Sequence, residues 1–158
     1  SVGIGGSITV QQMGLHDRLA SHNTVYWHWT DGAEALPKAM TAQVYLTSVN
    51  GLAETGEILN IDGNGNRVAA MLYGPSNVVV VVGANKIVKD EEEAWWRIQN
   101  IATPANARRL SRKSGCVDLG KCVNCQLEQR LCRDFVKIHS CMVPKRIKVF
   151  ILPESLGY

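Results

Sequence analysis

The chain of 158 residues is long enough for a hydrophobic core, and its composition, 46% hydrophobic and 20% charged, is typical of a globular protein. It contains no apolar run near the roughly 20 residues of a membrane span, and its first residues, SVGIGGS, lack the pattern of a signal peptide. Four of its five cysteines are clustered, unlike a secreted disulfide framework, so we expect a reducing cytoplasm.

The net charge of +3 conceals an uneven distribution. Residues 106–148 carry eleven lysines and arginines but three acids, whereas the remainder carries six bases and eleven acids. Such a segment indicates nucleic acid, a phosphorylated ligand or an acidic partner, or it is simply a solvated face. Because aromatic residues do not alternate with these bases, we rank nucleic acid below the other partners.

The chain opens with a short apolar strand, Val2–Ile4, followed by Gly5-Gly6-Ser7-Ile8-Thr9 and a helical pattern. This arrangement can bind phosphate, because a glycine turn joins a strand to a helix that has Ser7 near its N-cap. It is neither a dinucleotide fingerprint nor a Walker loop, so the signal is weak on its own. The Ser7 and Thr9 hydroxyls serve either a ligand or the helix cap.

Residues that favour β-structure predict strands at Thr24–Trp29 and Val44–Val49, with a short helix within Gly32–Thr41. The valine run at Val78–Gly83 predicts a strand buried on both faces, and hence the centre of a largely parallel sheet. Asn85 and Lys86 follow this strand directly.

The stretch Glu57–Pro75 carries the most informative loop. An apolar segment leads into Asp62-Gly63-Asn64-Gly65-Asn66-Arg67, and a helical pattern follows. Glycines here permit positive φ and close backbone approach, so several N–H groups can converge on an anion where the helix begins. Arg67 adds further donors, and Asp62 and Asn66 can orient hydroxyls or cap the helix. The alternative is an ordinary glycine- and asparagine-rich turn.

The last third predicts a helix over Asp90–Ile101 that is broken by Pro104 and a polar, cysteine-bearing loop over residues 111–133. Two closing strands follow, at Phe135–His139 and Ile147–Leu152. Strands that alternate with helices in this way indicate an α/β fold.

The loop contains Cys116, Cys122, Cys125 and Cys132. The Cys-x2-Cys pair places two thiolates on one turn, as zinc and iron sites require. The outer spacings match neither a zinc ribbon nor a ferredoxin sequence. We predict a zinc or iron–sulfur site at these four cysteines, with uncoordinated thiols as the alternative.

Several blocks together resemble the LUD domain, the family of lactate-utilisation proteins found in bacterial lactate-oxidation operons. They are GGSIT, LTSVNGLAETGEILNIDGNGNRVAAMLYGP, VGANKIV, PANARRL, the C-x5-C-x2-C-x6-C cluster and ILPESLGY. The resemblance covers essentially the whole chain, so we expect one domain over residues 1–158. Family members usually carry a helix and a strand before GGS, and we expect that this N-terminal segment is missing here.

The LUD family in turn resembles the ribose-5-phosphate isomerase and CoA-transferase superfold. The resemblance implies a Rossmann-like three-layer α/β/α sandwich with a mostly parallel sheet. By position, Gly6, Ser7 and Thr9 match the first ligand loop of that superfold, Gly63–Arg67 the second, and Lys86 the lysine after a central strand. All three would lie at the carboxyl ends of strands, where open α/β sheets bind ligands.

We therefore predict a site for a small anionic metabolite in these loops. Its predicted binding residues are Gly6, Ser7, Thr9, Asn60, Gly63, Gly65, Asn66, Arg67 and Asn85. Candidates for catalysis are Glu57 and Asp62, as groups for proton transfer, and Lys86, as an electrostatic clamp or base. The structural alternatives are turn residues for the two acids and a surface lysine at a strand end for Lys86.

The resemblance implies a subunit of an iron–sulfur-dependent L-lactate oxidation system that binds iron–sulfur partner subunits. The alternative is an enzyme that acts on a phosphorylated or CoA-linked small organic acid through Glu57 and Lys86. Since the sequence has no dinucleotide fingerprint, we do not expect a nicotinamide cofactor.

Overall fold

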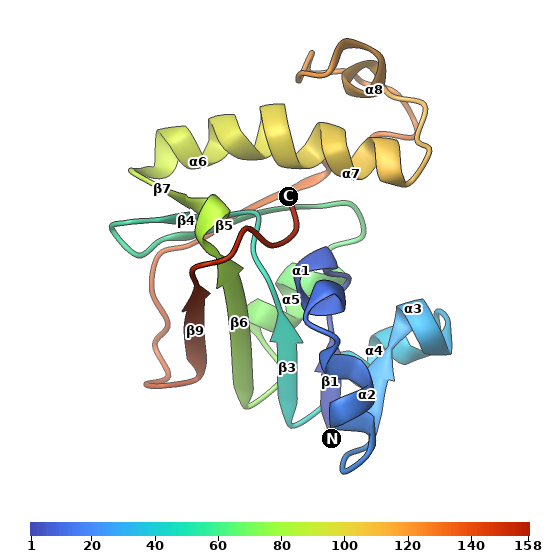
Figure 1. The fold of residues 1–158 in the computed structure, drawn as a ribbon, viewed down its shortest axis with the longest axis vertical. Helices are drawn as coiled ribbons and strands as arrows, with labels where there is room; N and C mark the ends of the chain where they lie inside the picture. Colours follow the sequence, from blue (N-terminus) through green and yellow to red (C-terminus); the bar gives the residue numbers. More distant parts are fainter. The chain divides into compact units, whose positions relative to one another are not determined.

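A computed structural model describes residues 1–158 and shows two compact units, each built from separate stretches of the chain (Figure 1). The parallel-sheet unit comprises Ser1–Val49, Gly65–Asn85 and Ser140–Gly157. The mixed-sheet unit comprises Asn50–Asn64, Lys86–His139 and Tyr158. None of the helices is both long and apolar enough to cross a membrane.

The parallel-sheet unit is organised around a five-stranded sheet of order β2-β1-β3-β6-β9, in which every pairing is parallel. Its strands are β1 (Val2–Ile4), β2 (Val25–Trp27), β3 (Val44–Thr47), β6 (Asn77–Gly83) and β9 (Ile147–Leu152). Its helices are α1 (Ile8–Gln12), α2 (Leu15–Ala20), α3 (His28–Asp31), α4 (Ala35–Met40) and α5 (Asn66–Leu72).

Helices cover both faces of this sheet. On one face, Ile4, Leu46 and Val81 form an apolar cluster against which side chains of α1 and α2 pack. Successive residues of a strand point to opposite faces. Gly3 accordingly meets the other layer, where a Cβ would come within 2.5 Å of the Ala39 carbonyl oxygen in α4. Since α4 contacts α5, both helices lie on this second face. The predicted Rossmann-like α/β/α arrangement is confirmed.

The valine run forms β6 as predicted and is buried on both faces. Val78, Val80 and Val82 are fully buried on one side and Val81 is buried on the other. The predicted position at the centre of the sheet is wrong. β6 is an interior strand, but it lies next to the edge strand β9.

The mixed-sheet unit contains a four-stranded sheet of order β7-β4-β5-β8. The strands are β4 (Gly51–Ala53), β5 (Ile58–Asp62), β7 (Ile87–Val88) and β8 (Asp134–Ile138). β5 is antiparallel to β4 and β8, whereas β4 and β7 are parallel. The helices are α6 (Glu91–Arg97), the π-helical turn η2 (Ile98–Ala102), α7 (Thr103–Arg109) and α8 (Gly115–Leu119). Ala94 and Ile98 pack on Leu59 and Ile61 to form its core.

The predicted helix break at Pro104 is wrong. Helical structure continues from α6 through η2 into α7, as Figure 1 shows. A proline inside a regular helix removes a hydrogen bond and collides with the preceding turn. Here Pro104 lies in the first turn of α7, directly after the wider π turn, where that cost is avoided.

The strand predicted over Thr24–Trp29 is shorter than expected. It ends at Trp27, and α3 begins at His28. The Trp27 N–H donates to the Asp31 carboxylate at 2.9 Å, and this local bond turns the chain into a helix despite its aromatic composition.

Candidate functional site

The loop between β1 and α1 forms as the sequence predicts, and Ser7 is the N-cap of α1. Its Oγ accepts a hydrogen bond from the Val10 N–H at 3.2 Å. The glycines serve close approach rather than positive φ. A Cβ on Gly5 would lie 2.7 Å from Thr47 Oγ1, and one on Gly6 would lie 3.1 Å from the His28 ring. The hydroxyl of Ser7 therefore has a structural role whether or not a ligand binds.

Buried hydroxyl groups gather where β1 and β3 end. Ser7, Thr9, Thr47 and Ser48 are all buried. Thr47 Oγ1 donates to the Ser48 carbonyl at 3.2 Å. A hydroxyl offers one donor and two acceptor positions, so such a group can serve the fold and a ligand together.

Thr9 and Asn85, both predicted to bind ligand, meet on one backbone segment, residues 153–157. Thr9 Oγ1 donates to the Leu156 carbonyl at 3.2 Å. The Asn85 side chain accepts from the Leu156 N–H at 3.0 Å and donates to the Gly157 carbonyl at 3.5 Å. Gln12 accepts from the Gly157 N–H at 2.7 Å. The first and third predicted loops thus share a partner at the carboxyl end of the parallel sheet.

The predicted anion loop connects β5 to α5. Gly65 is the N-cap of α5 and has φ +72°, so it uses the left-handed conformation that favours glycine. Gly63 has no positive φ; instead, a Cβ there would come within 3.1 Å of the Leu131 carbonyl oxygen. The two glycines are therefore needed for different reasons.

The direction of α5 follows from a contact at its far end. Arg146 directly precedes β9 and donates to the carbonyls of Ala70 and Met71 in the last turn of α5. The helix thus ends near the amino end of β9 and runs antiparallel to the strands of the sheet. Its first turn, with Asn66 and Arg67, points toward the carboxyl ends of the sheet.

Asn60 has a structural role in the mixed-sheet unit. Its Oδ1 accepts from the Asn50 N–H at 3.1 Å, and Asn50 Oδ1 accepts from the Ile61 N–H at 2.9 Å. Both bonds fasten the start of β4 to β5. The side chain of Asn60 is fully buried, as expected for such an anchor.

The two acidic candidates for catalysis lie far apart. Glu57 precedes β5 and Asp62 ends it, so about 16 Å of extended chain separates them. The Glu57 carboxylate accepts from the Thr55 hydroxyl and lies 3.1 Å from His139 Nδ1. The Thr55 hydrogen bond, followed by smaller effects including His139, lowers the pKa of Glu57. Glu57 is therefore ionised at neutral pH and suits a base or nucleophile rather than an acid.

Lys86, the third candidate, closes the 3-10 turn that follows β6 and is buried. Burial is uncommon for lysine, because the charged form is costly to remove from water. The predicted alternative of a surface lysine at a strand end is wrong for this residue.

The four clustered cysteines do not form a metal-binding group in this arrangement. Cys116 is buried in α8, and its Sγ lies 3.4 Å from Ser114 Oγ. Cys132 packs against the core of the mixed-sheet unit. No three His, Cys, Asp or Glu side chains are placed to hold a metal ion together. The residues as positioned do not fit zinc or an iron–sulfur cluster, and that site stays a prediction that requires the loop to rearrange.

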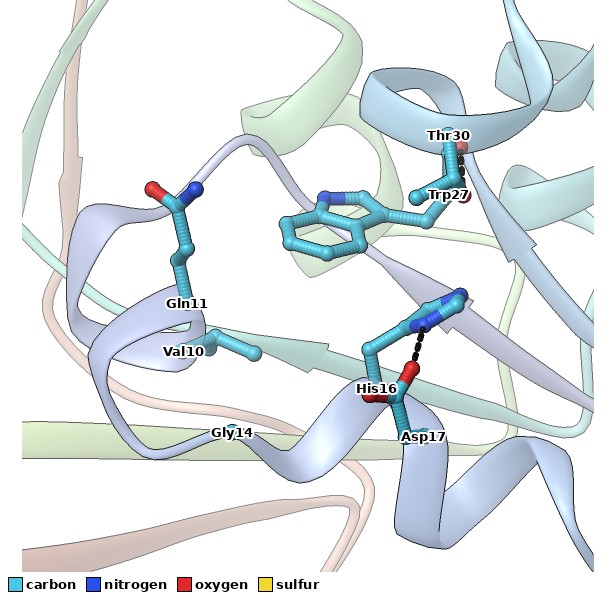
Figure 2. A pocket seen from close by; sticks show the side chains of 7 residues that line it. All are labelled: Val10, Gln11, Gly14, His16, Asp17, Trp27 and Thr30. Atoms are coloured by element: carbon cyan, nitrogen blue, oxygen red, sulfur yellow. Dashed lines mark hydrogen bonds and ion pairs between the residues drawn. The ribbon is translucent and has the colours of Figure 1, made fainter.

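One cavity was not predicted from the sequence. It has a volume of about 230 Å³ and is lined by Val10, Gln11, Gly14, His16, Asp17, Trp27 and Thr30 (Figure 2). The rings of Trp27 and His16 lie 5.2 Å apart, and His16 Nδ1 lies 3.0 Å from Asp17 Oδ1. The Trp27 indole N–H is buried without a hydrogen-bond partner. The only sequence signal near this cavity was the aromatic run around Trp27, and we interpreted that run as a strand.

Comparisons with known proteins identify a family and a likeness to solved structures. The family model of the LUD domain matches residues 1–152. A crystal structure of a DUF162 family protein from Deinococcus radiodurans is similar over 96% of this chain and 87% of that chain, with 14% identity and a TM-score of 0.43. No curated protein sequence matches.

Proposed function

The chain belongs to the LUD domain family, and from this we propose that it is a subunit of an iron–sulfur-dependent L-lactate oxidation system. In this proposal it binds a small organic anion at the carboxyl end of its parallel sheet. Electron transfer falls to iron–sulfur partner subunits.

One observation carries the anion site: buried hydroxyl groups at the carboxyl ends of β1 and β3 lie at the same edge of the sheet as the half-buried Asn85 amide that follows β6. Ser7, Thr9 and Asn85 all follow strands of the same parallel sheet. Open α/β sheets bind ligands at this edge. The direction of α5 supports Asn66 and Arg67 as further donors, and a guanidinium matches a carboxylate or phosphate in a planar, two-point contact.

The proposal for a partner rests on charge. Exposed bases cluster along the end of α7 and the loop after it, namely Arg108, Arg109, Arg112, Lys113 and Lys121. A surface of one sign steers association with a partner of the opposite sign. We propose that an acidic electron-transfer subunit docks there, so the association should weaken as salt concentration rises.

The alternative enzyme, acting on a phosphorylated or CoA-linked acid, is favoured by one observation, the burial of Lys86. A buried lysine can act as a base or hold a substrate anion. Lys86→Met should then abolish turnover of such an acid. Lys89→Met, at an exposed lysine nearby, should leave turnover intact, and this pair of results would support the alternative.

The anion site is tested by calorimetry with L-lactate and inorganic phosphate at millimolar concentration. Arg67→Ala should weaken binding by about 1.5–3 kcal/mol, the usual contribution of a charged hydrogen bond. Arg108→Ala, at an exposed base of α7, is the matched control and should bind like wild type. Wild-type protein that binds neither anion would refute the proposal.

A further inference from the structure

Residues 153–157 lie directly on the carboxyl end of β6. After β9 ends at Leu152, the Ala84 N–H donates to the Glu154 carbonyl at 3.1 Å. A Cβ on Gly83 would come within 2.7 Å of the Leu156 nitrogen and 2.8 Å of the Glu154 oxygen. Position 83 therefore requires glycine, because this segment leaves no room for a side chain there. Figure 1 shows the segment as the dark red chain beyond β9.

Two side-chain donors are directed at consecutive carbonyl oxygens of the segment. Thr9 Oγ1 donates to the Leu156 oxygen at 3.2 Å, and Asn85 Nδ2 donates to the Gly157 oxygen at 3.5 Å. The oxygens of a carboxylate or phosphate accept hydrogen bonds in the same way. The carbonyl groups of the segment therefore occupy the Thr9 and Asn85 donors that the proposed anion site would use.

Apart from its hydrogen bonds to Thr9, Gln12, Ala84 and Asn85, the segment has little to anchor it. Pro153, Glu154 and Ser155 are exposed, and Leu156 and Gly157 are only partly buried. Segments with few buried apolar contacts open at low cost in free energy, well before the fold itself unfolds.

We propose that residues 153–157 form a displaceable strap that competes with a small carboxylate or phosphate anion for Thr9 and Asn85. This inference rests on the proposed function, because it concerns the same site. The strap lowers the apparent affinity of the anion by the fraction of molecules in which it is open.

Two variants separate the strap from the anion donors. Gln12→Ala removes the acceptor of the Gly157 N–H, a 2.7 Å bond that belongs to the strap alone. Asn85→Asp keeps an acceptor for the Leu156 N–H but replaces the amide donor with a negative charge. Gln11→Ala, at the exposed neighbouring position, is the matched control.

The experiment measures binding of L-lactate and of inorganic phosphate in separate titrations, together with hydrogen exchange of the Leu156 and Gly157 amides. We expect the anion that binds to speed exchange at both amides. Gln12→Ala should bind it roughly five-fold more tightly, the factor that one ordinary hydrogen bond contributes. Asn85→Asp should not bind it, while Leu156 stays protected.

The outcomes distinguish the two proposals. Binding that leaves exchange at Leu156 and Gly157 unchanged or slower, or equal affinity in wild type and Gln12→Ala, overturns the strap and leaves the proposed function standing. Failure of both anions to bind wild-type protein overturns the anion site, and the strap as its competitor falls with it.

Discussion

Arg146 shows how a residue that is unremarkable in the sequence becomes a main support of the fold. It is one of eleven bases in a charged segment, yet its guanidinium is buried. It donates to the carbonyls of Met71 at 2.6 Å, Pro75 at 2.9 Å and Ala70 at 3.2 Å. The last carbonyls of a helix have no partner within the helix, so Arg146 satisfies those at the end of α5.

Replacing Arg146 with methionine should lower the free energy of unfolding by about 2–4 kcal/mol, because buried carbonyls lose their donors. Thermal or urea unfolding measures this loss. Lys89→Met, at an exposed lysine whose contact with Asp90 spans 3.8 Å, is the control and should change stability little. Equal effects of the two changes would contradict the role of Arg146.

His28 gives the parallel-sheet unit a pH dependence. Burial lowers its pKa from the ordinary value of 6.5. The unfolded chain therefore binds a proton at a higher pH than the folded one, so stability is full above pH 6.5 and declines as pH falls toward the folded pKa.

Unfolding midpoints measured across this pH range should decline less in His28→Gln than in wild type. His22→Gln, at an exposed position before β2, serves as the control. A wild-type profile that matches His28→Gln would rule out this contribution.

At the candidate site, residue types were predictable but their partners were not. The Ser7 cap could be predicted because its bond to Val10 spans three residues. Thr9 bonds to Leu156, 147 residues away, and Asn85 bonds to the same residue. No local pattern encodes such pairs, because they depend on where distant strands end.

At the scale of elements, the periodicity of the sequence predicts what local forces decide. The valines of β6 and the acidic first turn of α6 were both predictable, since burial and the helix dipole act within a few residues. The second sheet was not predicted. Its strand β7 has two residues, and it exists only because β4 lies beside it.

Val80 provides the test of the buried strand. Val80→Asp would place an unpaired charge in the core, so we expect no soluble, cooperatively melting protein. Val149 lies opposite Val80 on the edge strand β9 and is 39% exposed, so Val149→Asp should still fold. Circular dichroism during heating compares the two, and a cooperatively melting Val80→Asp protein would mean that the strand tolerates solvent.

The whole molecule consists of two units that each bury an apolar core of their own. The chain passes between the units several times, so neither unit is a continuous stretch of sequence. The family resemblance covers essentially the whole chain, and for that reason the sequence predicted one domain over residues 1–158. The parallel sheet draws its stability from Val2, Ile4, Leu46 and Val81, whereas the cysteine loop belongs to the other unit.

This separation makes a prediction for the cysteine loop, residues 111–133. The loop is polar and has little apolar area to order it, so bonds from thiolates to a metal would be its main source of order. Added Zn²⁺ should slow trypsin cleavage after Arg112, Lys113 and Lys121. Hydrogen exchange at Val78–Val82 should not change, because these amides belong to the separate parallel sheet.

The paired change Cys122→Ser and Cys125→Ser should abolish the protection by zinc, since it removes both thiols of the central turn. Cys141→Ser, at the exposed cysteine outside the loop, should retain it. Cleavage that is unaffected by zinc, or equal protection in the paired variant, would contradict a metal site. The four side chains would then act as separate thiols, which is how the structure places them, with Cys116 buried in α8 and Cys132 against the core.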